Sequence, residues 1–330
     1  MQRAKRLAVM LAVVLIALAG VLQVWAQGNV IHVSATAGTD GPGCGAGAAP
    51  PCRSIKFAVE NRAQTGDRIL VAAGTYTEPF SVLTSGVQIL ATGPAGINGQ
   101  DTRGPMIAAG AGITAATVIS GFTITGGVTT TTAAAGGVYL TGDASPVLHG
   151  NTICANGGFQ LARGGAGVVD AAGNWWGTNT PRAGVTYTGT VQAAPPISVS
   201  LQLRQPLTGT GSLGSLGSGS LVVGRVAQIT VTMKGGGYTP PPGTAITLKG
   251  THGAFSGGVT ATSLLIANGV ATTLFTPTAS RATVISAFHA CNPSQAVATL
   301  DFRFHVYLPL TLRGYPAPPP PPPPEPEPTC

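Results

Sequence analysis

The sequence predicts an all-β protein made of two successive β-domains, and three observations predict it. Residues 118–124 and 147–153 repeat one pattern: apolar, apolar, polar, Gly, any residue, Thr, Ile. Repeats at a period of tens of residues are typical of stacked-coil proteins, in which each coil covers the apolar face of the next. The chain has 48 glycines and only 8% charged residues, which favours strands and tight turns over surface helices. After Leu221, short alternating segments recur, and this is typical of a β-sandwich.

Residues 1–26 have the organisation of a secretory signal peptide. A basic segment at residues 2–6 precedes an apolar run from Leu7 to Leu22, and Val24 and Ala26 suit the −3 and −1 positions of a cleavage site. We expect cleavage before Gln27 and export of the remainder. The alternative is an uncleaved anchor, because about 20 apolar residues span a bilayer. Membrane contact is expected only through this segment.

The formal net charge of +7 overstates how basic the exported chain is. Arg3, Lys5 and Arg6 belong to the expected signal peptide, and the other arginines are scattered singly along the chain. The sequence has no cluster of Lys and Arg with interleaved aromatic residues. Nucleic acid is therefore not an expected partner.

Export makes the cysteines candidates for disulfides. Cys44 and Cys52 bracket a short loop of Gly, Ala and Pro, and we expect them to pair, which would stabilise the protein by about 2–3 kcal/mol. Cys154, Cys291 and Cys330 remain as an odd set whose state stays open, with Cys154 interpreted as a buried thiol in a coil core. The sequence has no Cys-x-x-Cys or Cys/His spacing typical of zinc, so no metal site is predicted.

The first part of the expected exported chain, residues 29–78, has the pattern of a segment that covers the end of a stack of coils. Strands are predicted over residues 30–33 and 68–71, and a short helix over residues 54–61 with Ser54 as its N-cap. The stretch CRSIKFAVENRAQTGDRILVAAGTYTE within residues 29–78 resembles the N-terminal capping segment of secreted right-handed parallel β-helix proteins of the pectate-lyase-like superfamily. That resemblance implies a β-helix over residues 27–195 whose open end the short helix closes.

Two features mark the coils and their end. Asn151 and Asn156 are expected at left-handed turn positions between coil strands. The motif GNWWG at residues 173–177 resembles the terminal motif of bacterial β-helix proteins. Trp175 and Trp176 can cover the last coil, and as candidate ligand-binding residues they can instead stack on sugar rings.

The composition changes after the coils. Residues 196–220 are rich in Gly and Ser and are interpreted as a linker. Within residues 221–306, the stretches PPPGTAITLKGTHGAFSG and NGVATTLFTPT resemble bacterial Ig-like modules of the invasin/intimin type, which implies a β-sandwich. Residues 307–330 hold the apolar peptide YLPLTLRG and a proline run expected to be an extended polyproline II spacer. The peptide is interpreted as a sorting tag or as a strand docked on the sandwich.

Polysaccharide cleavage is the activity that the β-helix resemblance implies. Lyases of that superfamily hold calcium with several acidic residues and use Arg or Lys as a base, and hydrolases need paired carboxylates. Between residues 80 and 195 the candidates are Asp101, Asp143 and Asp170, with Arg163 as a basic partner for Asp170. None of these aspartates has a second acidic residue beside it in the sequence. If Asp170 lies near Arg163, the simpler interpretation is a solvent-exposed ion pair in a loop. His149 is expected outward or packed and not as a base.

These observations favour an exported, non-catalytic surface or secreted protein for adhesion, surface structure or carbohydrate binding. The expected partner is an extracellular polysaccharide or a cell-envelope component, and no cofactor is predicted. The alternative is a polysaccharide lyase or glycoside hydrolase, for which Ca²⁺ would be a possible cofactor. Convergence of two of the aspartates and a basic residue in one groove would favour that alternative. A degenerate remnant of such an enzyme, or an assembly protein, is the third hypothesis.

Overall fold

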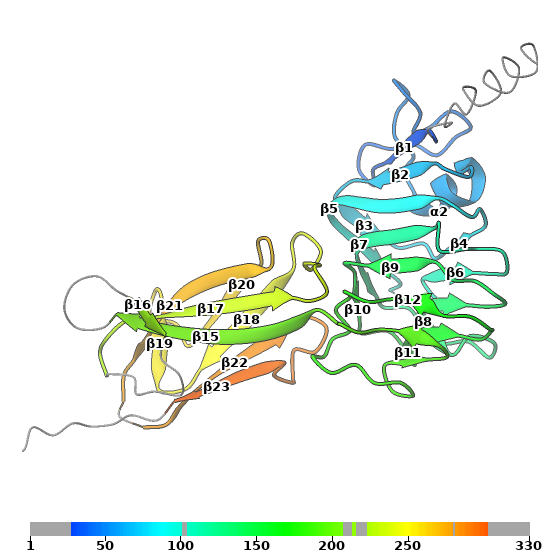
Figure 1. Ribbon diagram of the computed structural model, residues 1–330. Helices are drawn as coiled ribbons and strands as arrows, with labels where there is room; N and C mark the ends of the chain where they lie inside the picture. Colours follow the sequence, from blue (N-terminus) through cyan, green and yellow to red (C-terminus); the bar gives the residue numbers. More distant parts are fainter. Residues whose placement is uncertain (1–27, 101–103, 207–212, 216–222, 280, 303–330) are drawn as a thin grey trace, which may run out of the picture.

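The structure is a computed structural model, and it describes residues 28–100, 104–206, 213–215, 223–279 and 281–302. It is all-β, as predicted, with parallel sheets first and antiparallel sheets after them. We call residues 28–197 the parallel region and residues 198–302 the antiparallel region. In Figure 1 the parallel region is a tower of stacked rungs, and the antiparallel region extends sideways from the last rungs.

Several predictions from the sequence lie outside the described residues. They are the signal peptide over residues 1–26, the candidate Asp101, and the C-terminal peptide and tail over residues 307–330. Within the described part of the chain, helix is limited to α2 (Ile55–Phe57) and the π-helix η1 (Ala58–Arg62). No helix there has the length and hydropathy needed to cross a membrane.

The parallel region coils through three faces. The first face contains β1 (Val30–Val33), β2 (Arg68–Val71), the first part of β5 (Gln88–Asn98), the first part of β7 (Val118–Thr125) and β9 (Val147–His149). The second contains β3 (Gly74–Tyr76), the later parts of β5 and β7, and β10 (Thr152–Ile153). The third contains β4 (Phe80–Val82), β6 (Ile107–Ala109), β8 (Ala135–Leu140), β11 (Phe159–Arg163) and β13 (Tyr187–Thr188). A further parallel pair joins β12 (Val169–Asp170) and β14 (Val191–Gln192).

The core of the parallel region is a set of in-register apolar ladders. On the first face each residue pairs with the next along one ladder: Ile31, Ile69, Ile89, Ile119 and Leu148. All five side chains are buried. Every coil therefore covers the apolar face of its neighbour, which a single coil could not bury alone.

The repeated segments of the sequence are adjacent coils. Val118 pairs with Val147, and Thr123 pairs with Thr152. The shared glycine of the pattern is the corner between the first and second faces: Gly121 and Gly150 have φ values of 87° and 65°. Glycine adopts this left-handed conformation without the steric cost that a Cβ would add.

The expectation for Asn151 and Asn156 was wrong. The left-handed positions are held by the preceding residues, Gly150 and Ala155 (φ 53°). The asparagine side chains instead bind the previous coil: Asn151 Oδ1 accepts the Phe122 N–H at 3.0 Å, and Asn156 Oδ1 accepts a backbone N–H at 3.0 Å. A corner breaks the regular ladder and leaves backbone groups that a short amide side chain can satisfy.

The predicted short helix is present near the N-terminal end of the stack, in a segment that we call the cap. Ser54 caps α2, since its Oγ accepts the Phe57 N–H at 3.0 Å, and the helical turns continue as η1. Asp40 accepts the Ser54 N–H at 3.0 Å, and Cys44 is joined to Cys52 by a disulfide. The residues of this cap that face the core are Ile55, Ala58 and Val59.

The antiparallel region is a pair of sheets. One has the order β16-β15-β17-β21-β19, formed by Leu213–Ser215, Ser198–Pro206, Ala227–Lys234, Val270–Pro277 and Gly253–Phe255. The other has the order β20-β18-β22-β23, formed by Ala261–Leu265, Ala245–Gly250, Thr283–His289 and Ala298–Phe302. Alternate residues point into a shared core, as in β17, where Ala227, Ile229, Val231 and Met233 are buried.

The predicted linker over residues 196–220 is only partly a linker. Residues 198–206 form β15, which pairs with β17 along seven positions. The chain enters this strand directly from the last coil, where the Ile197 N–H donates to the Asn174 carbonyl at 2.9 Å. Apolar Val199, Leu201 and Leu203 alternate with polar residues, and this pattern predicts a strand. The prediction of a linker followed the Gly/Ser composition of the later residues instead.

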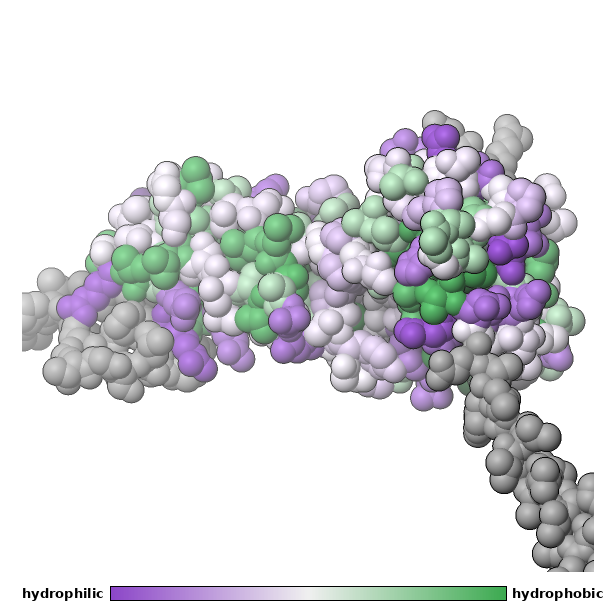
Figure 2. Space-filling model, turned by 90° about the horizontal axis from the view of Figure 1, so that it is seen from above, coloured by the Kyte–Doolittle hydropathy of each residue, from purple (hydrophilic) through white to green (hydrophobic). Residues whose placement is uncertain are grey.

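The outer surface of the antiparallel region carries exposed apolar side chains. Figure 2 shows green patches on this region beside polar surface. The exposed large apolar residues here include Val226, Val259, Leu265 and Leu274. Scattered exposure of single apolar residues is normal in soluble proteins.

Candidate functional site

The two regions meet at a junction built around the tryptophan pair. Trp175 is fully buried in the core of the antiparallel region and meets His289 edge-on, with ring centroids 5.5 Å apart. Trp176 is buried in the core of the parallel region, 6.0 Å from the ring of Tyr187. Adjacent residues in extended backbone point to opposite sides, so each indole enters a different core.

This arrangement favours the covering interpretation of Trp175 and Trp176 over the ligand-binding one. Their exposed fractions are 0% and 3%, so neither ring face is open to a sugar. The covering role is the one that their position supports, since Trp176 closes the last coil and Trp175 joins it to the antiparallel region. Each core therefore contains one of the two adjacent indole rings, and the large buried surface of each ring holds the two regions together.

A second junction cluster joins His149, Asp170 and Tyr238. His149 Nε2 lies 2.9 Å from Asp170 Oδ1, an ion pair whenever the ring is protonated. Tyr238 Oη lies 2.6 Å from His149 Nδ1, and the two rings are 4.6 Å apart. Tyr238 also lies on the backbone of Gly173, where an added Cβ would come within 2.1 Å of its ring. The cluster packs the first face of the coils against the antiparallel region.

The structure does not bring the other catalytic candidates together. Asp143 Oδ1 accepts the Gly112 N–H at 2.7 Å and so holds a turn. Arg163 lies on β11 and donates to the Ala166 carbonyl, while Asp170 lies on β12 of a different sheet with His149 as its partner. The predicted contact of Asp170 with Arg163 is therefore wrong. The Arg163 Nε and Nη1 atoms have no hydrogen-bond partner among the described residues.

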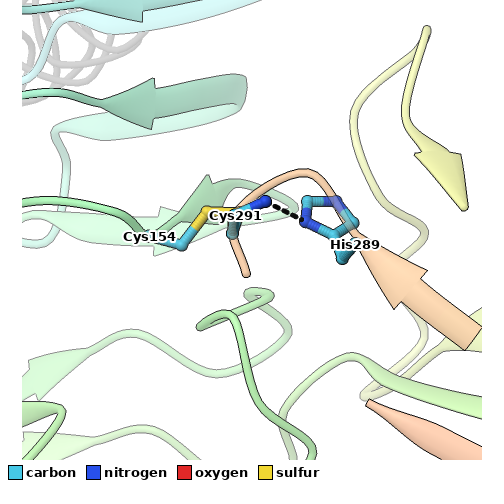
Figure 3. Close-up of side chains that lie close together, drawn as sticks. All are labelled: Cys154, His289 and Cys291. Carbon is cyan, nitrogen blue, oxygen red and sulfur yellow. Dashed lines mark hydrogen bonds between the residues drawn. A yellow bond between two sulfur atoms is a disulfide. The ribbon is translucent and has the colours of Figure 1, made fainter. Parts of the chain in front are cut away.

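The third junction cluster is Cys154, Cys291 and His289 (Figure 3). Cys154 follows β10, and its disulfide with Cys291 joins residues 137 positions apart. Cys154 is buried, as expected, but it is not a free thiol. One ligand atom from each of the three side chains lies within 4.8 Å of the others. No zinc-like spacing is visible in the sequence because Cys154 and His289 belong to different regions.

Burial governs the chemistry of His289. The side chain is 5% exposed, and desolvation lowers its pKa from the ordinary 6.5 to about 4. Its Nδ1 accepts the Cys291 N–H at 3.1 Å, as the dashed line in Figure 3 shows. The imidazole is therefore neutral near pH 7, with an acceptor nitrogen turned toward the disulfide loop.

A groove of about 470 Å³ lies beside this cluster and between the two regions. We call it the junction groove, and its lining residues are Asn98, Gln100, Thr123, Thr125, Gly126, Ala155, His289, Ala290 and Cys291. Its volume falls in the range of small-molecule sites. One wall is the outer side of the second face of the coils, and the other is the loop that follows β22.

The register of β5 and β7 explains the polar wall of this groove. Ala95, Ile97, Phe122 and Ile124 point into the core, so the alternate residues of both strands point outward. Asn98 pairs with Thr125, and Gly96 pairs with Thr123. Around the missing side chain of Gly96, no atom lies within 4 Å of where a Cβ would be. The wall is thus flat, uncharged and rich in hydroxyl and amide groups.

Sequence reasoning missed the groove and its second wall. Thr123 and Thr125 are visible in the repeat, but His289 and Cys291 reach the groove only through the packing of two regions. Alternation on β7 could have identified the outward threonines. No local pattern could have identified the loop after β22 as their partner.

Comparisons with known proteins leave the family of this chain open. No protein-family model matches it, and no curated protein or solved structure matches it either.

Proposed function

We propose that this chain is an exported, non-catalytic protein that binds an extracellular polysaccharide through the junction groove, at the cell surface or in the secreted state. The parallel region is, in this proposal, a right-handed β-helix of the pectate-lyase-like kind, and the antiparallel region an Ig-like module of the invasin/intimin type. Parallel in-register ladders support the first assignment, because parallel crossovers are almost always right-handed. Two packed antiparallel sheets support the second.

Export is supported by two independent features. The signal-like segment at residues 1–26 is one. The other is the presence of two disulfides, which persist in oxidising compartments.

The observation that carries the proposed binding function is the chemistry of the junction groove. Its polar wall presents hydroxyl and amide groups from Asn98, Gln100, Thr123 and Thr125. Such groups exchange hydrogen bonds with the hydroxyls of a sugar chain, and the flat surface at Gly96 lets the chain approach the sheet. The groove therefore favours a neutral, hydroxyl-rich polymer over a polyanion.

The test is a binding assay with matched threonine variants. Affinity electrophoresis and a glycan array first identify a bound polymer, and Thr123→Val with Thr125→Val then removes two hydroxyls while keeping the β-branched shape. We expect about tenfold weaker binding, since each hydrogen bond contributes roughly 0.5–1.5 kcal/mol. Thr272→Val on exposed β21 is the control and should bind normally.

A steric variant makes the same test sharper. Gly96→Tyr adds a ring to the open wall beside Thr123, where the backbone φ is not left-handed, and should block binding while the protein stays folded. Polymer binding that survives both Gly96→Tyr and the threonine pair would refute the groove as the site.

Polysaccharide cleavage is the second candidate, and the His149–Asp170–Tyr238 cluster is the observation that favours it. Carboxylate, imidazole and phenol within hydrogen-bond distance are the groups that general acid–base chemistry uses. Release of new reducing ends or unsaturated products from the bound polymer, lost in Asp170→Asn, would establish this activity. If the protein binds the polymer but releases no such products, the non-catalytic binding function is supported instead.

A further inference from the structure

We propose that Cys154, Cys291 and His289 form a redox-gated site for a thiophilic metal ion, with zinc as the reference ion. In oxidising surroundings the two cysteines are the disulfide that ties the regions together. Once a dithiol reduces it, the two sulfurs and the imidazole become three ligands of one ion. This site borders the junction groove through His289 and Cys291, but the proposal does not rest on polysaccharide binding.

The distances suit a tetrahedral centre. The three ligand atoms lie within 4.8 Å of one another. Zinc binds sulfur at about 2.3 Å and nitrogen at about 2.0–2.1 Å, which sets neighbouring ligand atoms about 3.5–3.8 Å apart. The sulfurs need only separate from bonding distance, and the ring is already close enough to complete the set.

The surroundings fix the ligands on one side and leave the other open. Cys154 and His289 are buried, and the backbone of Gly177 passes so close that a Cβ there would lie 3.2 Å from the Cys154 Cβ. On the other side, His289 and Cys291 line the junction groove. An ion can therefore enter from the groove and keep a water in the fourth position, the arrangement of three protein ligands and one open site.

The donor set selects soft and borderline metals. Two thiolates and one imidazole suit zinc or copper(I), and they suit calcium or magnesium poorly. The His289 Nδ1 faces Cys291 and accepts its N–H at 3.1 Å, so an ion that displaces this amide finds the nitrogen lone pair already oriented (Figure 3).

The dithiol is the only reagent that reduction of the disulfide requires. The dithiol transfers two electrons and two protons to the S–S bond and becomes a disulfide itself, which leaves Cys154 and Cys291 as thiols. Binding of a divalent ion then displaces both thiol protons to solvent, and two thiolate charges balance the two positive charges of the ion.

The test uses the full chain with Cys330→Ser, so that the remaining cysteines are the four of the two disulfides. After reduction with a dithiol and anaerobic desalting, the protein is titrated with Zn²⁺ and, separately, with Co²⁺, whose thiolate charge-transfer absorption reports sulfur ligation. We expect one ion per chain in the reduced protein and none in the oxidised protein.

Three variants identify the ligands. Cys154→Ser with Cys291→Ser should abolish binding and the charge-transfer band, and His289→Ala should weaken Zn²⁺ binding at least tenfold. Cys44→Ser with Cys52→Ser is the matched control and should bind normally. Circular dichroism of each reduced variant verifies the fold. Failure of the folded, reduced protein to bind one Zn²⁺, or binding that the Cys154 and Cys291 pair does not affect, would overturn the proposal.

Discussion

Asn151 is a single side chain on which a corner of the coil stack depends. It is fully buried, its Oδ1 accepts the Phe122 N–H, and its Nδ2 donates to the Ile119 carbonyl at 2.9 Å. Its Nδ2 also donates to Asn174 Oδ1 in the next coil at 3.1 Å. One amide therefore connects three successive coils at the corner where the strands turn.

Replacing Asn151 should expose this dependence. Asn151→Ala leaves the buried Phe122 N–H without its acceptor and removes the amide bonds to the Ile119 carbonyl and to Asn174, and we expect about 2–4 kcal/mol of lost stability. Urea unfolding followed by circular dichroism measures the loss. Asn61→Ala on the exposed side of η1 is the control and should change stability by less than about 0.5 kcal/mol. A similar effect of both variants would contradict this account.

His289 should make stability depend on pH. The folded pKa is about 4 and the ordinary value is 6.5, so between these values the unfolded chain binds a proton that the folded chain does not. The free energy of unfolding therefore rises with pH across this window, and this group contributes about 3 kcal/mol over the whole of it. Unfolding curves at several pH values between 4 and 7 measure the slope.

A pair of glutamine variants isolates that slope. His289→Gln keeps an acceptor for the Cys291 N–H but does not titrate, and it should flatten the rise between pH 4 and 6.5. His252→Gln, at an exposed histidine, should retain it. An unchanged slope in His289→Gln would show that other groups cause the pH dependence.

At the scale of elements, the short helical cap has too few residues to be stable alone. Isolated helices need about 12–15 residues, whereas α2 and η1 together span only residues 55–62. Asp40 accepts the Arg53 and Ser54 N–H groups and the Ser54 hydroxyl, and Ser54 in turn caps the helix. The cap is thus a small cooperative network built on a loop that the Cys44–Cys52 disulfide closes.

A double-mutant cycle should reveal this cooperation. Ser54→Ala should cost about 1 kcal/mol as a lost N-cap, and Asp40→Ala should cost a similar amount. The double variant should cost less than the sum of the two, because each side chain needs the other. Ser256→Ala, at an exposed turn of the antiparallel region, is the control. Strict additivity of Asp40→Ala and Ser54→Ala in urea unfolding would contradict the network.

At the scale of the whole molecule, the junction makes two regions into one unit. The Cys154–Cys291 disulfide crosses it. Asn179 Nδ2 donates to the carbonyls of Val199 and Val297 at 2.9 and 3.0 Å, and Trp175 lies in the core of the antiparallel region. These ties fix the L-shaped arrangement of Figure 1, in which the two walls of the junction groove face each other.

Removing the covalent tie should separate the unfolding of the two regions. A disulfide that closes 137 residues restricts the unfolded chain by roughly 4–5 kcal/mol. Cys154→Ser with Cys291→Ser should therefore lower the melting temperature and split one calorimetric transition into two. Cys44→Ser with Cys52→Ser, at the far end of the stack, should lower stability without the split. One unchanged transition in the junction variant would show that the regions are independent of the disulfide.

Local patterns were sufficient to predict much of the fold. The coil repeat, the Ser54 cap and the alternating strands after Leu221 each follow from interactions between residues close in sequence. The corners were predicted at Asn151 and Asn156 and lie instead at Gly150 and Ala155. Side-chain alternation and the steric freedom of glycine act within a few residues. For that reason the all-β class and the order of parallel then antiparallel strands were readable from the chain.

The junction was decided by tertiary structure. Trp175 and Trp176 share a motif, yet they enter different cores, and Cys154 finds Cys291 and His289 only when the last coils meet the loop after β22. The same packing turns the outward threonines of β7 into one wall of a groove. Contacts between residues more than a hundred positions apart depend on how whole elements pack, and no local pattern records that choice.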